Sequence, residues 1–177
     1  KEEVVGRMNA VVIIPARYAS SRLPGKLILP EVKMRTGRYI IEHVYQQARQ
    51  AKRIDRVIVA TDDQRIYDII TSFGGNVEMT SPSHNSGTDR IAEVAGRLTS
   101  DIIVNVQGDE PEIEGCMVDQ VVEALEINQD ASANCEPSRK TRSGFSLLTR
   151  CARRRMKSNS GRFPVRSVGR ILTVRRS

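Results

Sequence analysis

The chain has 177 residues, of which 39% are hydrophobic and 28% are charged, a composition typical of one soluble globular domain with a sizeable core. Its longest wholly apolar run, Ala10 to Ile14, is far too short to span a bilayer, and no charged-then-apolar leader opens the chain. We therefore expect a cytoplasmic protein without a membrane partner, in which three cysteines that lack CxxC spacing are reduced thiols.

The net charge of +7 is distributed unevenly along the chain. Residues 1–136 carry a net charge of −6, whereas residues 137–177 carry +13 and contain no acidic residue. So sharp a change in composition indicates that two different segments meet near Pro137.

In the first segment, short β-branched runs alternate with stretches whose apolar residues have helical spacing. In chain order the pattern predicts a strand at 10–14, a helix over 39–52, a strand at 57–60, a helix with apolar residues from 66 to 73, a weak strand at 77–79, a helix with apolar residues from 91 to 98, a strand at 102–106 and a helix with apolar residues from 117 to 125. Strands separated by helices imply right-handed crossovers. The predicted fold is α/β, with an open, mostly parallel sheet and helices on both faces.

Two helix starts and one helix end also have sequence signals. Thr61 and Gln64 have the spacing of a capping box, and so do Ser86 and Asp89. Gly74-Gly75 can end the helix that precedes it in a left-handed turn.

The loop after the first strand is rich in cations and hydroxyls, at the edge of a parallel sheet where ligands bind. It contains Arg17, Ser20, Ser21, Arg22 and Lys26. Such a loop can bind a polyphosphate, although neither GxxxxGK[ST] nor GxGxxG is present. From charge and position alone, an ordinary solvated basic loop explains these residues equally well.

After the fourth strand comes Gln107-Gly108-Asp109-Glu110-Pro111. Asp109 could hold Mg²⁺, which prefers carboxylate and phosphate oxygens, or the segment could be a polar turn. The cationic loop on a nearby strand end favours a joint metal–triphosphate site.

Ser86-Gly87-Thr88, at a predicted helix N-terminus, could receive a polar ligand, although N-capping alone also explains it. His84 has no Cys or His partner at metal spacing.

Four motifs together resemble the 3-deoxy-manno-octulosonate (Kdo) cytidylyltransferases, in that family's order and spacing, over about Asn9 to Pro137. They are Ile14–Lys26, Ala60–Asp63, His84–Arg90 and Val104–Pro111. The resemblance implies a Rossmann-like, nucleotide-diphospho-sugar transferase-like fold. It also implies an enzyme that uses CTP and Mg²⁺ to convert Kdo to CMP-Kdo and pyrophosphate for lipopolysaccharide biosynthesis. Members of the family are typically cytoplasmic homodimers.

The resemblance also implies roles for individual residues. Arg17, Ser20, Ser21, Arg22 and Lys26 would hold and activate the triphosphate, and Asp109 would be a metal ligand. Arg17, Arg22, Lys26 and Asp109 would form the catalytic group, in an in-line attack by the sugar's anomeric 2-hydroxyl on the α-phosphorus. Ser86, Gly87, Thr88 and Gln107 would contact the base or the ribose.

The resemblance stops at Pro137, so we expect an incomplete, truncated cytidylyltransferase domain at 8–137 and an Arg/Ser-rich basic tail at 138–177. The tail has no sustained strand or helix period, and it could be a nucleic-acid-binding segment, a disordered segment or the product of a shifted reading frame. We favour the last and expect no nucleic-acid partner. Without the family's later strands, the 102–106 strand should be an unpaired edge, and the chain should make little CMP-Kdo.

Two other functions remain open. The chain could activate another acidic sugar, such as a sialic acid, or it could be a non-catalytic nucleotide- or RNA-binding remnant.

Overall fold

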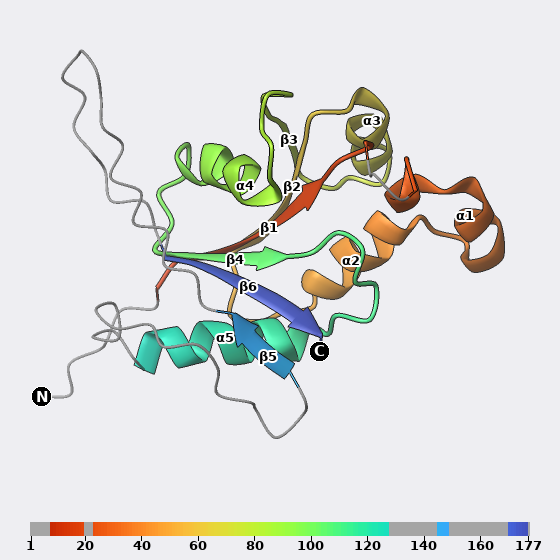
Figure 1. Cartoon of the computed structure of the whole chain (residues 1–177). Helices are drawn as coiled ribbons and strands as arrows, with labels where there is room; N and C mark the ends of the chain where they lie inside the picture. The colour runs from red at the N-terminus through yellow and green to blue at the C-terminus, as the bar shows by residue number, and fades with distance from the viewer. Residues whose placement is uncertain (1–7, 20–22, 128–144, 149–169, 177) are drawn as a thin grey trace, which may run out of the picture.

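The computed structural model describes residues 8–19, 23–127, 145–148 and 170–176. In these residues, six strands form one sheet in the order β3-β2-β1-β4-β6-β5 (Figure 1). Their bounds are β1 (Ala10–Ala16), β2 (Arg56–Thr61), β3 (Val77–Met79), β4 (Ile102–Val106), β5 (Phe145–Leu148) and β6 (Arg170–Arg176). All neighbours pair in parallel except β5, which is antiparallel to β6. The predicted α/β class with a mostly parallel sheet is confirmed.

Helices cover both faces of this sheet. The larger apolar cluster contains buried residues of α2, α3 and α5, and the smaller one contains those of α4. The helices are the 3₁₀ helix η1 (Lys26–Ile28), α1 (Pro30–Thr36), α2 (Ile40–Ala48), α3 (Gln64–Ser72), α4 (Gly87–Ala95) and α5 (Gly115–Ile127). No helix in this described part of the chain is both long and apolar enough to cross a membrane.

β1 is central because both of its faces are apolar. Val12 and Ile14 belong to the larger cluster, whereas Val11 and Ile13 belong to the smaller one. This alternation follows from the period of two in a strand, and it explains why the run reads as continuously hydrophobic.

The chain reverses its direction of travel across the sheet at β1. From β1 it proceeds through β2 to β3, and it then returns to place β4 on the other side of β1. The ladder between β1 and β2 continues to Ala16, paired with Thr61, while the ladder between β1 and β4 ends at Ile13, paired with Asn105. In open α/β sheets, such a switch point is where ligands bind.

All eight predicted elements are present, most of them with shifted ends. The predicted strands at 77–79 and 102–106 match β3 and β4, and Gly74 has the expected left-handed backbone, with φ of 76°. The predicted capping box at Thr61 is wrong: Asp63 caps α3, accepting a hydrogen bond from the Arg65 N–H, because β2 continues through Thr61. Neither η1 nor α1 was predicted.

The prediction that β4 is an unpaired edge is also wrong. β6 pairs with it along its whole length, from Ile102 with Arg170 to Val106 with Val174. Both β5 and β6 come from the basic segment after Pro137. The remainder of that segment lies outside the described residues, so the boundary at Pro137 and the shifted reading frame stay predictions.

Candidate functional site

Two oppositely charged side chains meet at the switch point between β1 and β4. Lys26 Nζ, in the segment after β1, lies 3.1 Å from Asp109 Oδ2, in the turn after β4. The two side chains are 42% and 49% exposed, so both can contact a ligand from solvent. The structure thus brings together a cation and a carboxylate that the sequence placed after two different strands.

Gly25 shapes the segment that presents Lys26. Its φ of 70° is left-handed, and its N–H donates to the Tyr18 carbonyl at 2.8 Å. A Cβ at this position would lie 2.8 Å from the Tyr18 ring, so glycine allows the chain to close over that ring. Lys26 then opens η1, and the buried side chain of Leu27 holds η1 against the core.

Gly108 allows the turn that carries Asp109 to approach the end of β1. A Cβ on Gly108 would lie 3.2 Å from the Pro15 carbonyl oxygen and 3.3 Å from Leu27. The turn after β4 therefore packs on the same short stretch that supports η1, which explains why Lys26 and Asp109 are neighbours.

Arg17 links the loop after β1 to the segment before α4. Its Nη1 donates to the Asn85 carbonyl at 3.2 Å, and both residues are exposed. Ser20, Ser21 and Arg22, the other predicted phosphate contacts of this loop, lie outside the described residues.

The N-terminus of α4 also lies against the end of β1. Ser86 Oγ accepts from the Asp89 N–H at 3.2 Å and donates to Asp89 Oδ2 at 2.8 Å, so the predicted cap is confirmed. A Cβ on Gly87 would lie 3.3 Å from the Pro15 ring, so glycine permits a close approach of the helix. Thr88 is half-buried in the first turn. The first-turn N–H groups give this end a partial positive charge that suits a polar or anionic ligand.

Gln107 follows β4 directly and is half-buried. Its Nε2 donates to Asn105 Oδ1 at 3.0 Å. Because Asn105 is only 4% exposed within β4, the amide of Gln107 is oriented by a group that belongs to the core.

Sequence reasoning missed two arginines near this edge. Arg90, on α4, is fully buried and bonds to Asp62 and Thr80. Its spacing of four residues from Val94 puts it on the helix's apolar face, a signal that was present in the sequence. Arg65, on α3, stacks over the Tyr18 ring, with its guanidinium carbon 3.3 Å from the ring centre.

Arg65 also lowers the pKa of the neighbouring carboxyl of Asp63. Arg65 donates to both carboxylate oxygens of Asp63, at 2.9 and 2.6 Å. These bonds hold the pKa of Asp63 below its ordinary value of 3.8. Asp63 therefore stays ionised as both the cap of α3 and the anchor of Arg65.

A metal at this edge would depend on Asp109. Among the described residues, no group of three or more His, Cys, Asp or Glu is placed to hold a metal ion. Mg²⁺ in nucleotide sites is commonly bound by one or two carboxylates together with phosphate oxygens and waters. One exposed carboxylate beside a cationic segment fits that manner of binding and does not fit a metal held by protein groups alone.

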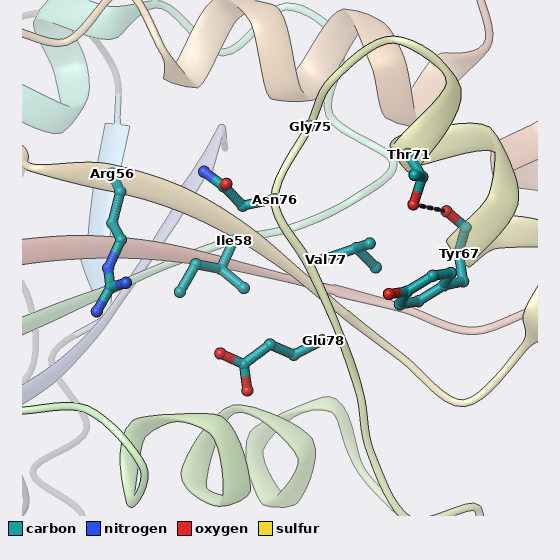
Figure 2. Close-up of a pocket in the computed structure, with 8 residues that line it drawn as sticks. All are labelled: Arg56, Ile58, Tyr67, Thr71, Gly75, Asn76, Val77 and Glu78. Atoms are coloured by element: carbon teal, nitrogen blue, oxygen red, sulfur yellow. Dashed lines mark hydrogen bonds between the residues drawn. The ribbon is translucent and has the colours of Figure 1, made fainter.

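A separate cavity of about 360 Å³ lies at the β3 edge, and none of the predicted site residues lines it (Figure 2). Glu78, one of its charged residues, is already paired with Arg97 at 3.1 Å. The lining residues are Arg56, Ile58, Tyr67, Thr71, Gly75, Asn76, Val77 and Glu78. The candidate site is therefore the edge that carries Lys26 and Asp109, where the residues predicted from the sequence meet.

Comparisons with known proteins bear on the fold and the family of the chain. A family model described as cytidylyltransferase matches residues 11–159. The 3-deoxy-manno-octulosonate cytidylyltransferase of Geobacter metallireducens is 51% identical over 118 residues, which are 67% of this chain and 45% of the relative. The chain thus spans about half the length of the curated relatives that it matches.

Two solved structures resemble the fold. A CMP:2-keto-3-deoxy-manno-octonic acid synthetase in complex with CTP superimposes with a TM-score of 0.64 at 43% identity, covering 68% of this chain and 48% of that one. A cytidylyltransferase from Leptospira borgpetersenii has a TM-score of 0.60 at 29% identity, covering 69% of this chain and 50% of that one.

Proposed function

This chain belongs to the cytidylyltransferase family, and from that premise we propose that it carries the CTP-binding part of an enzyme that activates Kdo. The reaction joins CTP and Kdo to give CMP-Kdo and pyrophosphate, which would serve lipopolysaccharide biosynthesis in the cytoplasm. The observation that carries the proposal is the meeting of Lys26 and Asp109 at the switch point between β1 and β4.

Each strand end would bind one part of the nucleotide. Arg17 and Lys26, with Ser20, Ser21 and Arg22 of the same loop, would hold the triphosphate through charge-assisted hydrogen bonds. Ser86, Gly87 and Thr88 at the start of α4 would contact the base or the ribose, together with Gln107.

Asp109 would hold Mg²⁺, which when bound neutralises charge on the phosphates. Lys26 would leave Asp109 and bind a phosphate oxygen when the nucleotide arrives, because an ion pair this exposed holds its two side chains weakly. Arg17, Arg22, Lys26 and Asp109 thereby form the proposed catalytic group.

The proposed chemistry is a nucleotidyl transfer, in which the CMP part of CTP moves to Kdo. The 2-hydroxyl oxygen of Kdo forms a bond to the α-phosphorus and loses its proton, while the bond from that phosphorus to the bridging oxygen of the β-phosphate breaks and pyrophosphate leaves. Such a transfer depends mainly on positioning and charge neutralisation, which are what the cationic loop and the α4 N-terminus can supply.

We propose that the 177 residues by themselves bind CTP but transfer little of it to Kdo, since they cover about half the length of the matched relatives. In the family the sugar-binding residues, a second metal-binding aspartate and the homodimer contacts follow the position of Pro137. The misplacement of an attacking group by about 1 Å can already reduce a rate about a hundredfold.

The test is the shift in melting temperature with CTP and with ATP, at matched Mg²⁺. At 100 times its Kd, a ligand stabilises the folded state by about 2.7 kcal/mol, which is roughly 5–10 °C for a chain of this size. We expect a shift of that order for CTP and a clearly smaller one for ATP. Equal shifts would refute the cytidine assignment. Kdo-dependent pyrophosphate release of about 1 per second or more would refute the expected loss of transfer.

A further inference from the structure

Among the residues whose side-chain burial the structure describes, Arg90 is the one charged residue that is fully buried, with 0% of its side chain exposed. It lies in α4, one turn after the segment proposed to contact the cytidine, Ser86-Gly87-Thr88. A guanidinium is always charged, so placing one out of contact with water needs a compensating arrangement of partners.

Its partners come from two other strand ends. Nη2 donates to Asp62 Oδ2 at 2.6 Å, directly after β2, and Nη1 donates to Thr80 Oγ1, directly after β3. Thr80 in turn donates through Oγ1 to the Thr61 carbonyl at 3.0 Å, and its N–H donates to the same oxygen at 2.8 Å. One side chain therefore ties the carboxyl ends of two strands to α4.

This arrangement is a poor device for stability alone. Desolvating a charged pair offsets much of its attraction, and apolar side chains of similar volume are often as stable or more so. In addition, Arg90 Nε is buried without a hydrogen-bond partner. The guanidinium of Arg90 instead fixes the position of α4, because its two donors are held in one rigid plane and bond to groups that follow β2 and β3.

The orientation of α4 decides where its N-terminus lies. Gly87 packs against the Pro15 ring within 3.3 Å, and Asn85, just before the helix, accepts a hydrogen bond from Arg17. A small rotation of the helix would therefore move the proposed base- and ribose-binding segment away from the triphosphate loop. Such a rotation would break the exposed bond from Arg17 to Asn85. Lys26 and Asp109 would stay where they are, because these residues are held by η1 and by the turn after β4.

We infer that Arg90 is a positioning residue, which through Asp62 and Thr80 sets the α4 N-terminus for the cytidine part of the nucleotide and leaves triphosphate binding unaffected. This inference rests on the proposed function. It predicts a split between two ligands: variants that disturb Arg90 should bind CTP more weakly, yet bind inorganic tripolyphosphate as the parent chain does.

The experiment measures the Kd of both ligands by calorimetry for the full chain at one Mg²⁺ concentration. Arg90→Lys keeps the charge but replaces the rigid two-donor fork by a single ammonium on a flexible stem, which does not fix the geometry between Asp62 and Thr80. Thr80→Val removes the hydroxyl at nearly constant volume, and Thr80→Ser restores it. Arg97→Lys is the matched control, since Arg97 lies just beyond the other end of α4 and pairs with Glu78 and Glu93 on the surface.

We expect Arg90→Lys to raise the Kd for CTP about tenfold or more, and Thr80→Val to raise it about threefold. The Kd for tripolyphosphate should stay within about twofold in both variants, and Thr80→Ser and Arg97→Lys should bind both ligands as the parent does.

Three results would overturn the inference. An unchanged Kd for CTP in both disruptive variants would show that Arg90 does not position α4, and a parallel loss of both ligands would show a merely structural role. If Arg90→Lys does not fold, the comparison of Thr80→Val with Thr80→Ser decides. A parent chain that binds CTP no more tightly than tripolyphosphate would instead refute the cytidine site, and with it the proposed function.

Discussion

Replacing Asp109 by Asn should greatly reduce the effect of Mg²⁺ on CTP binding without unfolding the chain. In the free protein, Asp109 interacts with Lys26 at 3.1 Å. Two unit charges at that distance attract by about 1.3 kcal/mol in bulk water. Because both side chains are nearly half exposed, screening and side-chain entropy reduce the contribution to about 1 kcal/mol or less. The substitution should therefore lower the free energy of unfolding by no more than that.

The effect on CTP binding should have opposite signs with and without the metal. Without divalent cations, a carboxylate near the triphosphate repels it, so Asp109→Asn should tighten CTP binding by up to about tenfold, or 1.4 kcal/mol. With Mg²⁺ present, the parent gains a metal bridge that the amide cannot supply as well. The variant should then bind CTP about tenfold more weakly than the parent.

The assay is calorimetric titration of CTP in EDTA and in excess Mg²⁺, for the parent, Asp109→Asn and Asp101→Asn. Asp101 is the matched control because it precedes β4 and accepts a hydrogen bond from the Asn9 N–H at the opposite edge of the sheet. Its substitution changes the charge equally but should not alter the Mg²⁺ dependence. If Mg²⁺ still tightened CTP binding to Asp109→Asn as much as to the parent, the proposed metal role of Asp109 would be wrong.

Two further predictions concern stability. Gly115→Ala should lower the free energy of unfolding, measured in urea, by about 1–3 kcal/mol, because the new Cβ would lie 2.6 Å from Ala51 N. Gly96→Ala is the control and should not lower it in this way, because its Cβ would lie 3.4 Å from the nearest atom. Equal losses of stability in the two variants would contradict this account. Asp63→Asn should destabilise the chain at pH 7, and the deficit should shrink as the pH falls. Arg65 lowers the pKa of Asp63 in the folded chain below its ordinary 3.8. The stability that the charge of Asp63 contributes is therefore present above the ordinary pKa and is lost as the pH falls through the lower pKa of the folded state. A deficit that stayed constant from pH 7 to about pH 3 would show that the charge of Asp63 contributes nothing.

The alternation of strands and helices was predictable because burial on both faces leaves a clear pattern. The runs at 77–79 and 102–106 match β3 and β4, and Ser86 caps α4 as expected. In contrast, α1 contains no buried residue and begins at a proline, so it produces no apolar period for a sequence to show. The pairing of β6 with β4 could not be anticipated, since the basic segment has no alternation and its register depends on a distant partner.

The candidate site was partly predictable for a related reason. In a parallel sheet, residues that follow neighbouring strands meet at one edge, which is sufficient to place Lys26 near Asp109. The role of Arg90 was not predictable in this way. A charged residue on an apolar helix face has a meaning only when its partners are known, and Asp62 and Thr80 come from two separate strand ends.

Pro15 explains why β1 and β4 part where they do. The Ala10 carbonyl accepts a hydrogen bond from the Asp55 N–H on the β2 side, whereas the Asn9 carbonyl accepts one from the Ile102 N–H on the β4 side. Because the N–H and C=O of one strand residue point to the same side and successive residues alternate, the odd-numbered residues of β1 direct both groups toward β4. Pro15 is odd-numbered and has no N–H, so β1 can offer β4 no donor beyond Ile13, where their ladder ends. The ladder with β2 is unaffected and continues to Ala16. The place where the ladder between β1 and β4 ends is thus a property of the main chain itself, and it does not depend on which side chains the surrounding loops carry.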